Sequence, residues 1–139
     1  MLSSSMPVKK KRGSTIKVEW QHNGLSELIL VDDMHERKKL LLENTDAVIA
    51  LPGGTGTLEE LLEAITLKKL GVFTKPIIIF NQDGFYDPLI KMFELCIKEK
   101  FMRTEHLGIW SVISEPDELL DALQNAPHWD KSAISFAAV

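Results

Sequence analysis

The stretch AVIALPGGTGTLEE, residues 47–60, decides the fold, because it joins an apolar run to a helical pattern through three glycines. Residues 47–51 are uninterrupted and apolar, as expected for a strand covered on both faces of a parallel sheet. After the glycines, apolar residues recur at helical spacing, at Leu58, Leu61, Leu62 and Ile65. The stretch therefore predicts a strand, a glycine-rich turn and a helix in immediate succession.

The turn, residues 52–57 and called the glycine loop below, has the chemistry of an anion site. Glycines let backbone N–H groups approach a ligand, and a helix start adds unpaired donors and a positive dipole end. The loop lacks the Gly-Lys-Ser/Thr ending of a P-loop, and Glu59 stands where a dinucleotide fingerprint has its third glycine. A strand-glycine-helix junction also occurs in α/β proteins as an ordinary connecting turn that binds no ligand, so this alternative stays open on the pattern alone.

Composition restricts the class of protein. A chain of 139 residues with 45% hydrophobic content suits one globular domain. The net charge of -4 predicts no broad surface for nucleic acid or for an anionic membrane. The single cysteine, Cys96, excludes an internal disulfide and is expected to fill the core, and no apolar run suggests a membrane span or a secretory signal. We therefore expect a cytoplasmic protein. The basic cluster at residues 9–12 could be an address label or a nucleic-acid arm, but its Ser, Pro and Gly context favours a solvated terminus.

Strands and helices alternate along the chain. The expected strands are residues 28–31, 47–51, 77–80 and 110–113, and the expected helices begin with 34–44 and with 57–70, which Gly71 closes. A third helix is expected to open with Asp87 as N-cap and Pro88 as its first residue, and a fourth opens near Ser114. Their expected inward faces are Leu89, Met92, Phe93, Cys96 and Ile97 in the third, and Leu119, Leu120 and Leu123 in the fourth. This alternation predicts an α/β, doubly wound parallel sheet with its ligand at the carboxyl ends of the strands. Four strands resemble the second half of such a fold. Residues 1–15 form an atypical N-terminal segment, 16–126 the domain and 127–139 a loose C-terminal tail.

Charged residues surround the expected anion site. Arg37 and Lys38 follow the strand at 28–31, which places their helix at the same sheet edge as the glycine loop, although both also suit a solvated helix surface. Glu60 has two interpretations. It completes a capping box with Thr57, which would give it a structural role, or it is a carboxylate that lies beside the anion site because it has a functional role there.

Two linked motifs resemble a known family. Met34-His35-Glu36-Arg37-Lys38, followed by the residues from Pro52 to Glu60, closely resembles the signatures MHxRK and PGGxGTxxE of the LONELY GUY (LOG) family of cytokinin riboside 5′-monophosphate phosphoribohydrolases. The resemblance runs from about Glu19 to Asn125. It implies a Rossmann-like fold and hydrolysis of the N-glycosidic bond of a nucleoside 5′-monophosphate, a cytokinin riboside monophosphate or AMP, to free base and ribose 5-phosphate.

The resemblance also implies roles for residues. Arg37 and Glu60 would be the catalytic pair, Lys38 and Thr66 would help to bind ribose phosphate, and Glu19 would meet the base. The loop residues implied in substrate binding are Gly53, Gly54, Thr55, Gly56, Thr57, Leu58 and Glu59. The family implies a homodimer, and the expected reaction needs no cofactor and no metal.

Three alternatives to this hydrolase remain. Family members carry an N-terminal Rossmann half that residues 1–15 do not resemble, so the chain could be an inactive truncated homologue. Related Rossmann-like proteins, including molybdenum-cofactor carriers, bind phosphate ligands through a similar loop without hydrolysis. The label lysine decarboxylase is also attached to the family, but the sequence marks no pyridoxal phosphate lysine with its partners.

Overall fold

The computed structural model describes residues 43–138, and every structural statement below concerns this range. Its strands are β1 (Val48–Ala50), β2 (Ile77–Phe80) and β3 (Trp110–Ile113). Its helices are α2 (Thr55–Lys69), α3 (Asp87–Lys98) and α4 (Leu119–Gln124), and its 3-10 turns are η2 (Gln82–Gly84), η3 (Thr104–Ile109), η4 (Pro116–Glu118) and η5 (Lys131–Phe136). The expected strand at 28–31 and most of the expected helix at 34–44 lie outside the described residues.

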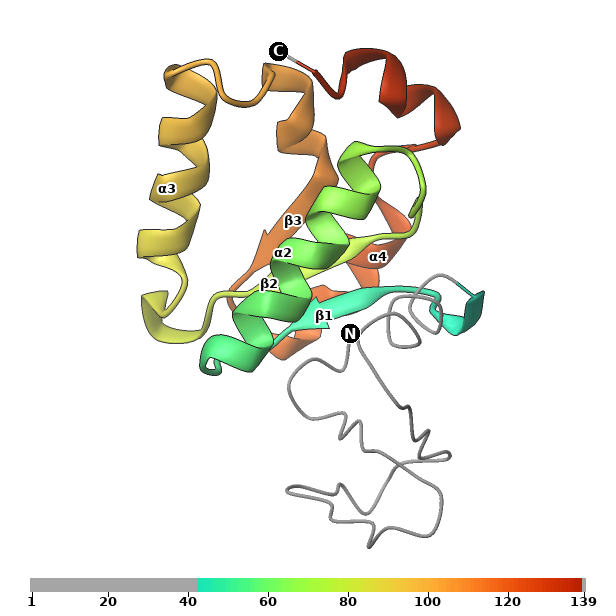
Figure 1. Cartoon of the computed structure of the whole chain (residues 1–139). Helices are drawn as coiled ribbons and strands as arrows, with labels where there is room; N and C mark the ends of the chain where they lie inside the picture. Colours follow the sequence, from blue (N-terminus) through green and yellow to red (C-terminus); the bar gives the residue numbers. More distant parts are fainter. Residues whose placement is uncertain (1–42, 139) are drawn as a thin grey trace, which may run out of the picture.

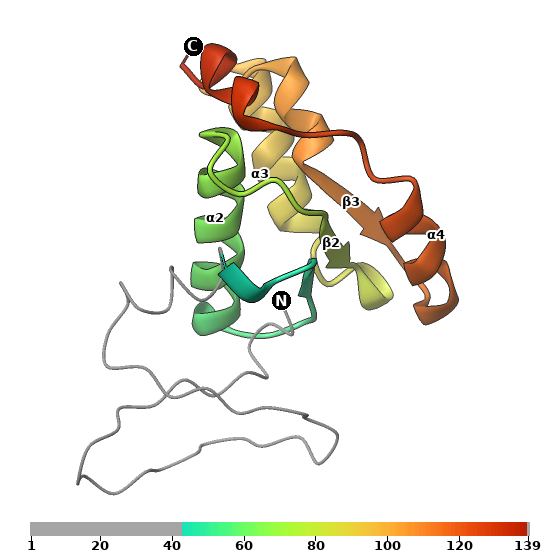
Figure 2. The same ribbon diagram turned by 90° about the vertical axis from the view of Figure 1, so that its right-hand side faces the viewer.

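The three strands form one parallel sheet in the order β1-β2-β3. Its register pairs Val48 with Ile77, and Ile77 with Trp110. Helices cover both faces, with α2 on one side of the strands and α4 on the other (Figures 1 and 2). The prediction of an α/β parallel sheet is therefore confirmed.

The core lies between the sheet and the helices that follow β1 and β2. Strand side chains that are fully buried meet the inner row of α2, where Leu61 and Ala64 are also fully buried. The ring of Phe93 on α3 lies 4.6 Å from the ring of Trp110 on β3, measured between centroids. Ile49 is only half-buried, so the described residues cover one face of β1 more completely than the other, contrary to the expectation for residues 47–51.

Two backbone features explain where the helices end and begin. Gly71, expected to close the helix before it, has a φ of +77° directly after the C-cap of α2, and a Cβ there would lie 2.7 Å from the carbonyl oxygen of Lys131. Pro88 lies in the first turn of α3, as expected. However, the N-cap is Tyr86 and not Asp87, whose carboxylate instead accepts a hydrogen bond from Asn81 Nδ2 at 2.8 Å.

Two expected apolar helix faces are less buried than their sequence suggests. On α3, only Phe93 is buried, Cys96 is half-buried and Met92 remains 55% exposed. On α4, Leu120 was expected to face inward and is 70% exposed. Because α4 is a short helix that packs with one narrow side, it half-buries the i, i+4 pair formed by Leu119 and Leu123, and it turns Leu120 about 100° away from that side.

The segment after Pro127 is packed, and the expectation of a loose tail is wrong for it. The indole Nε1 of Trp129 donates to the carbonyl oxygen of Lys68 at 2.7 Å, and Ala133 is buried at 2% exposure. Arg103 Nε donates to the carbonyl oxygen of Ala138 at 2.7 Å. The segment therefore closes over the end of α2, where it is drawn in red in Figure 1. Within residues 43–138, no helix combines the length and apolar character needed to cross a bilayer.

Candidate functional site

The glycine loop leaves the carboxyl end of β1 and becomes the first turn of α2. Gly54 is the N-cap, with φ -98° and ψ -151°, and no side chain of the described residues caps this end. The amide of Leu58 donates to the carbonyl oxygen of Gly54 at 3.1 Å and so closes the first turn. The amides of the residues before Leu58 have no acceptor within the helix, and the helix dipole makes this end positive. The backbone alone thus offers several donors to an anion.

The glycines here are not explained by backbone shape or by packing. Gly54 and Gly56 do not have positive φ, and a Cβ built on either would meet no described atom within 4 Å. Gly56 lies inside α2, where glycine costs about 0.5–1 kcal/mol relative to alanine. Since the described fold does not require these glycines, the interpretation of the glycine loop as an ordinary connecting turn loses support. A ligand that approaches the backbone closely would require them.

Thr57 is a fully buried polar residue in the first turn of α2. Its Oγ1 has no hydrogen-bond partner among the described residues. The expected capping box is therefore wrong, because Thr57 is the third residue of the helix rather than its cap, and its hydroxyl does not accept a bond from the Glu60 amide. An unsatisfied buried hydroxyl costs about 1–3 kcal/mol, which a ligand bond at this position would recover.

The two glutamates follow in the second turn of α2, because the helix begins two residues earlier than the sequence suggested. Glu59 is exposed, whereas Glu60 is half-buried with its Oε2 shielded from solvent. Thr66 is exposed and lies about 14 Å further along the helix axis than Thr57, at about 1.5 Å per residue. The structure thus brings Glu60 near the loop but leaves Thr66 away from it.

The charged residues expected to complete the site lie outside the described residues. These are Arg37, Lys38 and Glu19. The roles of Arg37 beside Glu60 and of Glu19 at the base therefore stay predictions.

A pocket of about 570 Å³ adjoins the start of the loop. It is lined by Ile49, Leu51, Pro52, Phe80, Gln82, Pro116 and Leu119, which come from the ends of β1 and β2, the turn after β3 and α4. Its volume is typical of a small-molecule site, and its mostly apolar lining suits a flat aromatic group. Four of these residues, Phe80, Gln82, Pro116 and Leu119, were not among the site residues expected from the sequence. The available signal was their position at or just after the carboxyl ends of the later strands, where open α/β sheets bind ligands.

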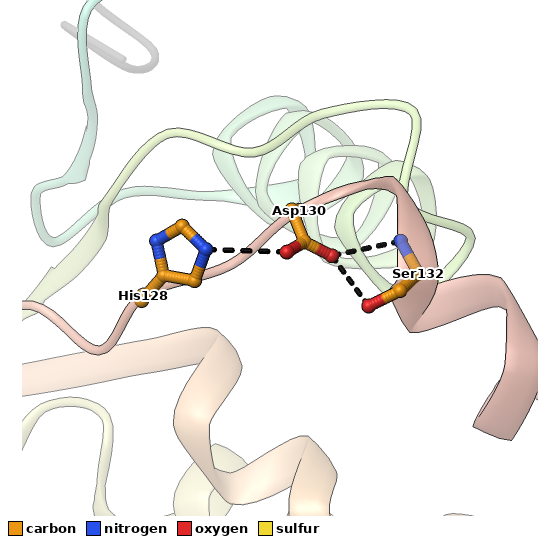
Figure 3. A network of polar contacts seen from close by, with 3 residues as sticks. All are labelled: His128, Asp130 and Ser132. Carbon is orange, nitrogen blue, oxygen red and sulfur yellow. Dashed lines mark hydrogen bonds and ion pairs between the residues drawn. The ribbon is translucent and has the colours of Figure 1, made fainter.

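A second cluster, His128, Asp130 and Ser132, contains the residue types of a hydrolytic triad but not its geometry (Figure 3). His128 Nε2 lies 3.2 Å from Asp130 Oδ2, while the other carboxylate oxygen accepts from the amide of Ser132 at 2.8 Å and from its hydroxyl. These bonds from Ser132 hold the pKa of Asp130 below its usual value. Because the carboxylate, and not the imidazole, contacts the serine, His128 cannot take its proton. The cluster caps η5.

Metal coordination finds no support in the described part of the chain. No group of three or more His, Cys, Asp or Glu side chains within residues 43–138 is arranged to hold an ion. The loop donors and the Glu60 carboxylate are therefore the chemistry that the described site offers.

A parallel sheet with an uncapped, glycine-rich helix start at a strand end defines a Rossmann-like α/β protein, and this helix start is the candidate anion site. A family model described as "Possible lysine decarboxylase" matches residues 7–123. Curated relatives that match carry the name cytokinin riboside 5′-monophosphate phosphoribohydrolase, with LOG designations. The chain belongs to this family, the LOG family, which confirms the resemblance of its two motifs.

Three relatives illustrate the similarity. "Probable cytokinin riboside 5′-monophosphate phosphoribohydrolase LOGL1" of Oryza sativa subsp. japonica is 48% identical, over 81% of this chain and 55% of its own length. The rice protein named LOG is 46% identical over 66% of this chain and 37% of its own length. The "Cytokinin riboside 5′-monophosphate phosphoribohydrolase" of Rhodococcoides fascians is 46% identical over 60% of this chain and 42% of its own length. The chain thus spans about half the length of the curated relatives it matches, or less.

Proposed function

We propose that this protein binds nucleoside 5′-monophosphates and hydrolyses their N-glycosidic bond, giving free base and ribose 5-phosphate. The observation that carries the proposal is the start of α2, where glycines that the described fold does not require, an uncapped helix end and the unsatisfied hydroxyl of Thr57 coincide. Each of these has a physical explanation if a phosphate binds there. The names of the relatives supply the substrate class.

In the proposed complex, the loop amides and Thr57 Oγ1 donate hydrogen bonds to the 5′-phosphate. The nucleobase would occupy the pocket beside Leu51 and Pro52, whose apolar side chains would contact the ring faces. Holding the phosphate and the base at fixed points orients the bond between base and sugar, which lowers the entropic part of the barrier. Lys38, Thr66 and Glu19 are the further binding residues that the family motifs suggest.

Glu60 is the proposed catalytic carboxylate. Cleavage of the ribosyl C–N bond builds positive charge on the sugar, which a nearby carboxylate stabilises. The same carboxylate can take a proton from the attacking water, whose oxygen bonds to C1′ as the C1′–N bond breaks. The departing base takes up a proton from solvent, and Glu60 afterwards releases its proton to solvent, so that the net reaction consumes one water. General base help of this kind contributes about 10²–10⁴-fold. Arg37 is the proposed partner that holds the phosphate or positions Glu60.

A homodimer and a cytoplasmic location belong to the same proposal. Exposed apolar side chains on α3, such as Met92 and Leu95, support self-association, because a second copy would remove them from water. The net charge of -4 gives no reason to expect nucleic acid or an anionic membrane as a partner. The relative rates with a cytokinin riboside monophosphate and with AMP decide which of the two is the preferred substrate.

The lysine decarboxylase alternative finds no support in the buried lysine of α2. Lys68 Nζ donates to the carbonyl oxygen of Lys75 at 2.8 Å, and it lies 5.7 Å from the ring centroid of Trp129. This contact is at the opposite end of the helix from the glycine loop, about 16 Å from Thr57 at about 1.5 Å per residue. Lys68 is therefore not placed to form a Schiff base at the proposed site.

The test is an assay of the 139-residue chain with AMP and with isopentenyladenosine monophosphate, in which ribose 5-phosphate is measured. Glu60→Gln and Arg37→Ala should lower the rate by about 10²-fold or more, because each removes a group proposed to act at the reacting bond. Glu94→Gln, an exposed carboxylate on α3, is the matched control and should keep the wild-type rate. Equal product from wild type and both site variants would reject the catalytic assignment. Binding of AMP without product would favour the non-catalytic phosphate binder.

A further inference from the structure

Tyr86, the single tyrosine of the chain, links the glycine loop to the rest of the site. It is 1% exposed, and its hydroxyl donates to the carbonyl oxygen of Leu51 at 2.6 Å. Leu51 is the last residue before the glycine loop. A buried hydroxyl needs a partner, and this one finds it in a backbone group 35 positions earlier in the chain.

Tyr86 is itself held by the turn after β2. Its amide donates to Asn81 Oδ1 at 2.7 Å, and Asn81 Nδ2 donates to Asp87 Oδ1 at 2.8 Å. The amide of Asn81 donates to the carbonyl oxygen of Ile113, the last residue of β3, at 2.7 Å. Hydrogen bonds therefore run from the end of β3 through Asn81 and Tyr86 to the end of β1.

The loop has few other restraints among the described residues. Within residues 43–138, a Cβ on Gly54 or Gly56 would meet nothing within 4 Å, and no side chain caps the start of α2. Glycine-rich backbone loses more conformational freedom on ordering than other sequences do, so each fixed point counts. The carbonyl of Leu51 is such a point, because it belongs to the peptide group that leads into the loop, and fixing its orientation limits the orientations of the peptide groups that follow.

We propose that Tyr86 is a positioning residue of the glycine loop: its hydroxyl fixes the carbonyl of Leu51, so that the loop amides are already aimed at the phosphate before it binds. The identity of the bound anion rests on the proposed function, whereas the restraint on the loop does not. An ordered loop loses less entropy on binding, which raises affinity without any new contact to the ligand. Burial also raises the pKa of the Tyr86 phenol, so it remains protonated and able to donate at neutral pH.

The first measurement is amide hydrogen exchange at Leu58 in the full chain, called loop exchange below. This amide is protected by its bond to the carbonyl oxygen of Gly54 at 3.1 Å, so its exchange reports how firmly the loop is held. Tyr86→Phe removes one oxygen atom and keeps the buried ring. Loop exchange should become about fivefold faster, the factor that corresponds to the net ~1 kcal/mol of a typical hydrogen bond. Trp129→Phe is the matched control, because it also removes a side-chain donor to a backbone carbonyl, that of Lys68 at 2.7 Å, at the other end of α2. Loop exchange should be unchanged in this variant.

The second measurement is steady-state kinetics with AMP, with inorganic phosphate as a competing ligand. Tyr86→Phe should raise KM and the phosphate inhibition constant about fivefold with kcat unchanged, because the loop holds the phosphate equally before and during reaction. A merely structural role would instead reduce the active fraction, which lowers the apparent kcat and leaves KM alone.

Unchanged loop exchange in Tyr86→Phe, or an equal increase in Trp129→Phe, would overturn the proposal. A changed kcat with unchanged KM would also overturn it. If wild type hydrolyses no nucleotide, the proposed function fails, while the exchange comparison still decides the role of Tyr86.

Discussion

Replacing Thr57 with valine should make the protein more stable and its binding of phosphate weaker. Valine keeps the β-branched shape and nearly the same helix propensity but has no hydroxyl. Thr57 is fully buried, and its Oγ1 has no partner among the described residues. The change therefore removes an unsatisfied polar group from the folded protein, which should raise the free energy of unfolding by about 1–3 kcal/mol.

Binding should change in the opposite direction, because the same hydroxyl is proposed to donate to the phosphate. A hydrogen bond to a charged group is worth about 1.5–3 kcal/mol, so the dissociation constant for AMP should rise about tenfold to a hundredfold. Stability is measured by urea unfolding without ligand, and affinity by isothermal titration calorimetry with AMP. Thr104→Val, at an exposed threonine that begins η3, is the control and should change neither quantity appreciably.

The opposite signs make this test informative. A hydroxyl that only supports the fold would give a less stable variant, and one that lies away from the ligand would leave AMP affinity unchanged. Either result would refute the reasoning.

Three further outcomes are expected. Gly56→Ala should stabilise the ligand-free protein by about 0.5–1 kcal/mol in urea unfolding, since a Cβ meets no described atom, and should weaken AMP binding in calorimetry because that Cβ obstructs the loop. Acid should destabilise the protein through His106, whose Nδ1 accepts from the Arg103 amide at 2.9 Å and whose pKa is lowered by burial. The unfolded state therefore takes up the proton first, and the free energy of unfolding falls as pH drops below about 6.5. His106→Gln should flatten this slope in urea unfolding between about pH 7.5 and 5. Burial lowers the pKa of Lys68 to about 8, so the unfolded chain keeps this proton to higher pH than the folded protein does. The free energy of unfolding should therefore rise between about pH 8 and 10.5, by at most about 3 kcal/mol. Lys68→Met should remove this gain, measured by urea unfolding at each pH.

The order of strands and helices could be predicted from the sequence because each element carries its own local signal. The apolar runs at 77–80 and 110–113 became β2 and β3, and Gly71 and Pro88 marked a helix end and a helix start at the expected places. The parallel arrangement followed from alternation alone, since parallel strands need a crossover between them.

The start of α2 was predicted less well, because two residues compete to cap it. Thr57 with Glu60 fits the pattern of a capping box, yet the helix begins at Thr55 with Gly54 as its cap. A capping pattern in the sequence identifies side chains that can accept bonds from the first amides of a helix. It does not show that, as here, no side chain of the described residues does so.

Long-range contacts were also beyond reach. Neither the bond from Tyr86 to Leu51 nor the bond from Trp129 to Lys68 has a periodic signature, since the partners are 35 and 61 positions apart. The exposure of Met92 likewise depends on what covers α3 in three dimensions and not on its helical spacing.

The comparison of AMP with adenosine by titration calorimetry tests the central claim most directly. If the start of α2 grips a 5′-phosphate, AMP binds, adenosine binds at least about tenfold more weakly, and inorganic phosphate competes with AMP. Equal affinities for the nucleotide and the nucleoside, or no measurable heat with either on a folded sample, would contradict it.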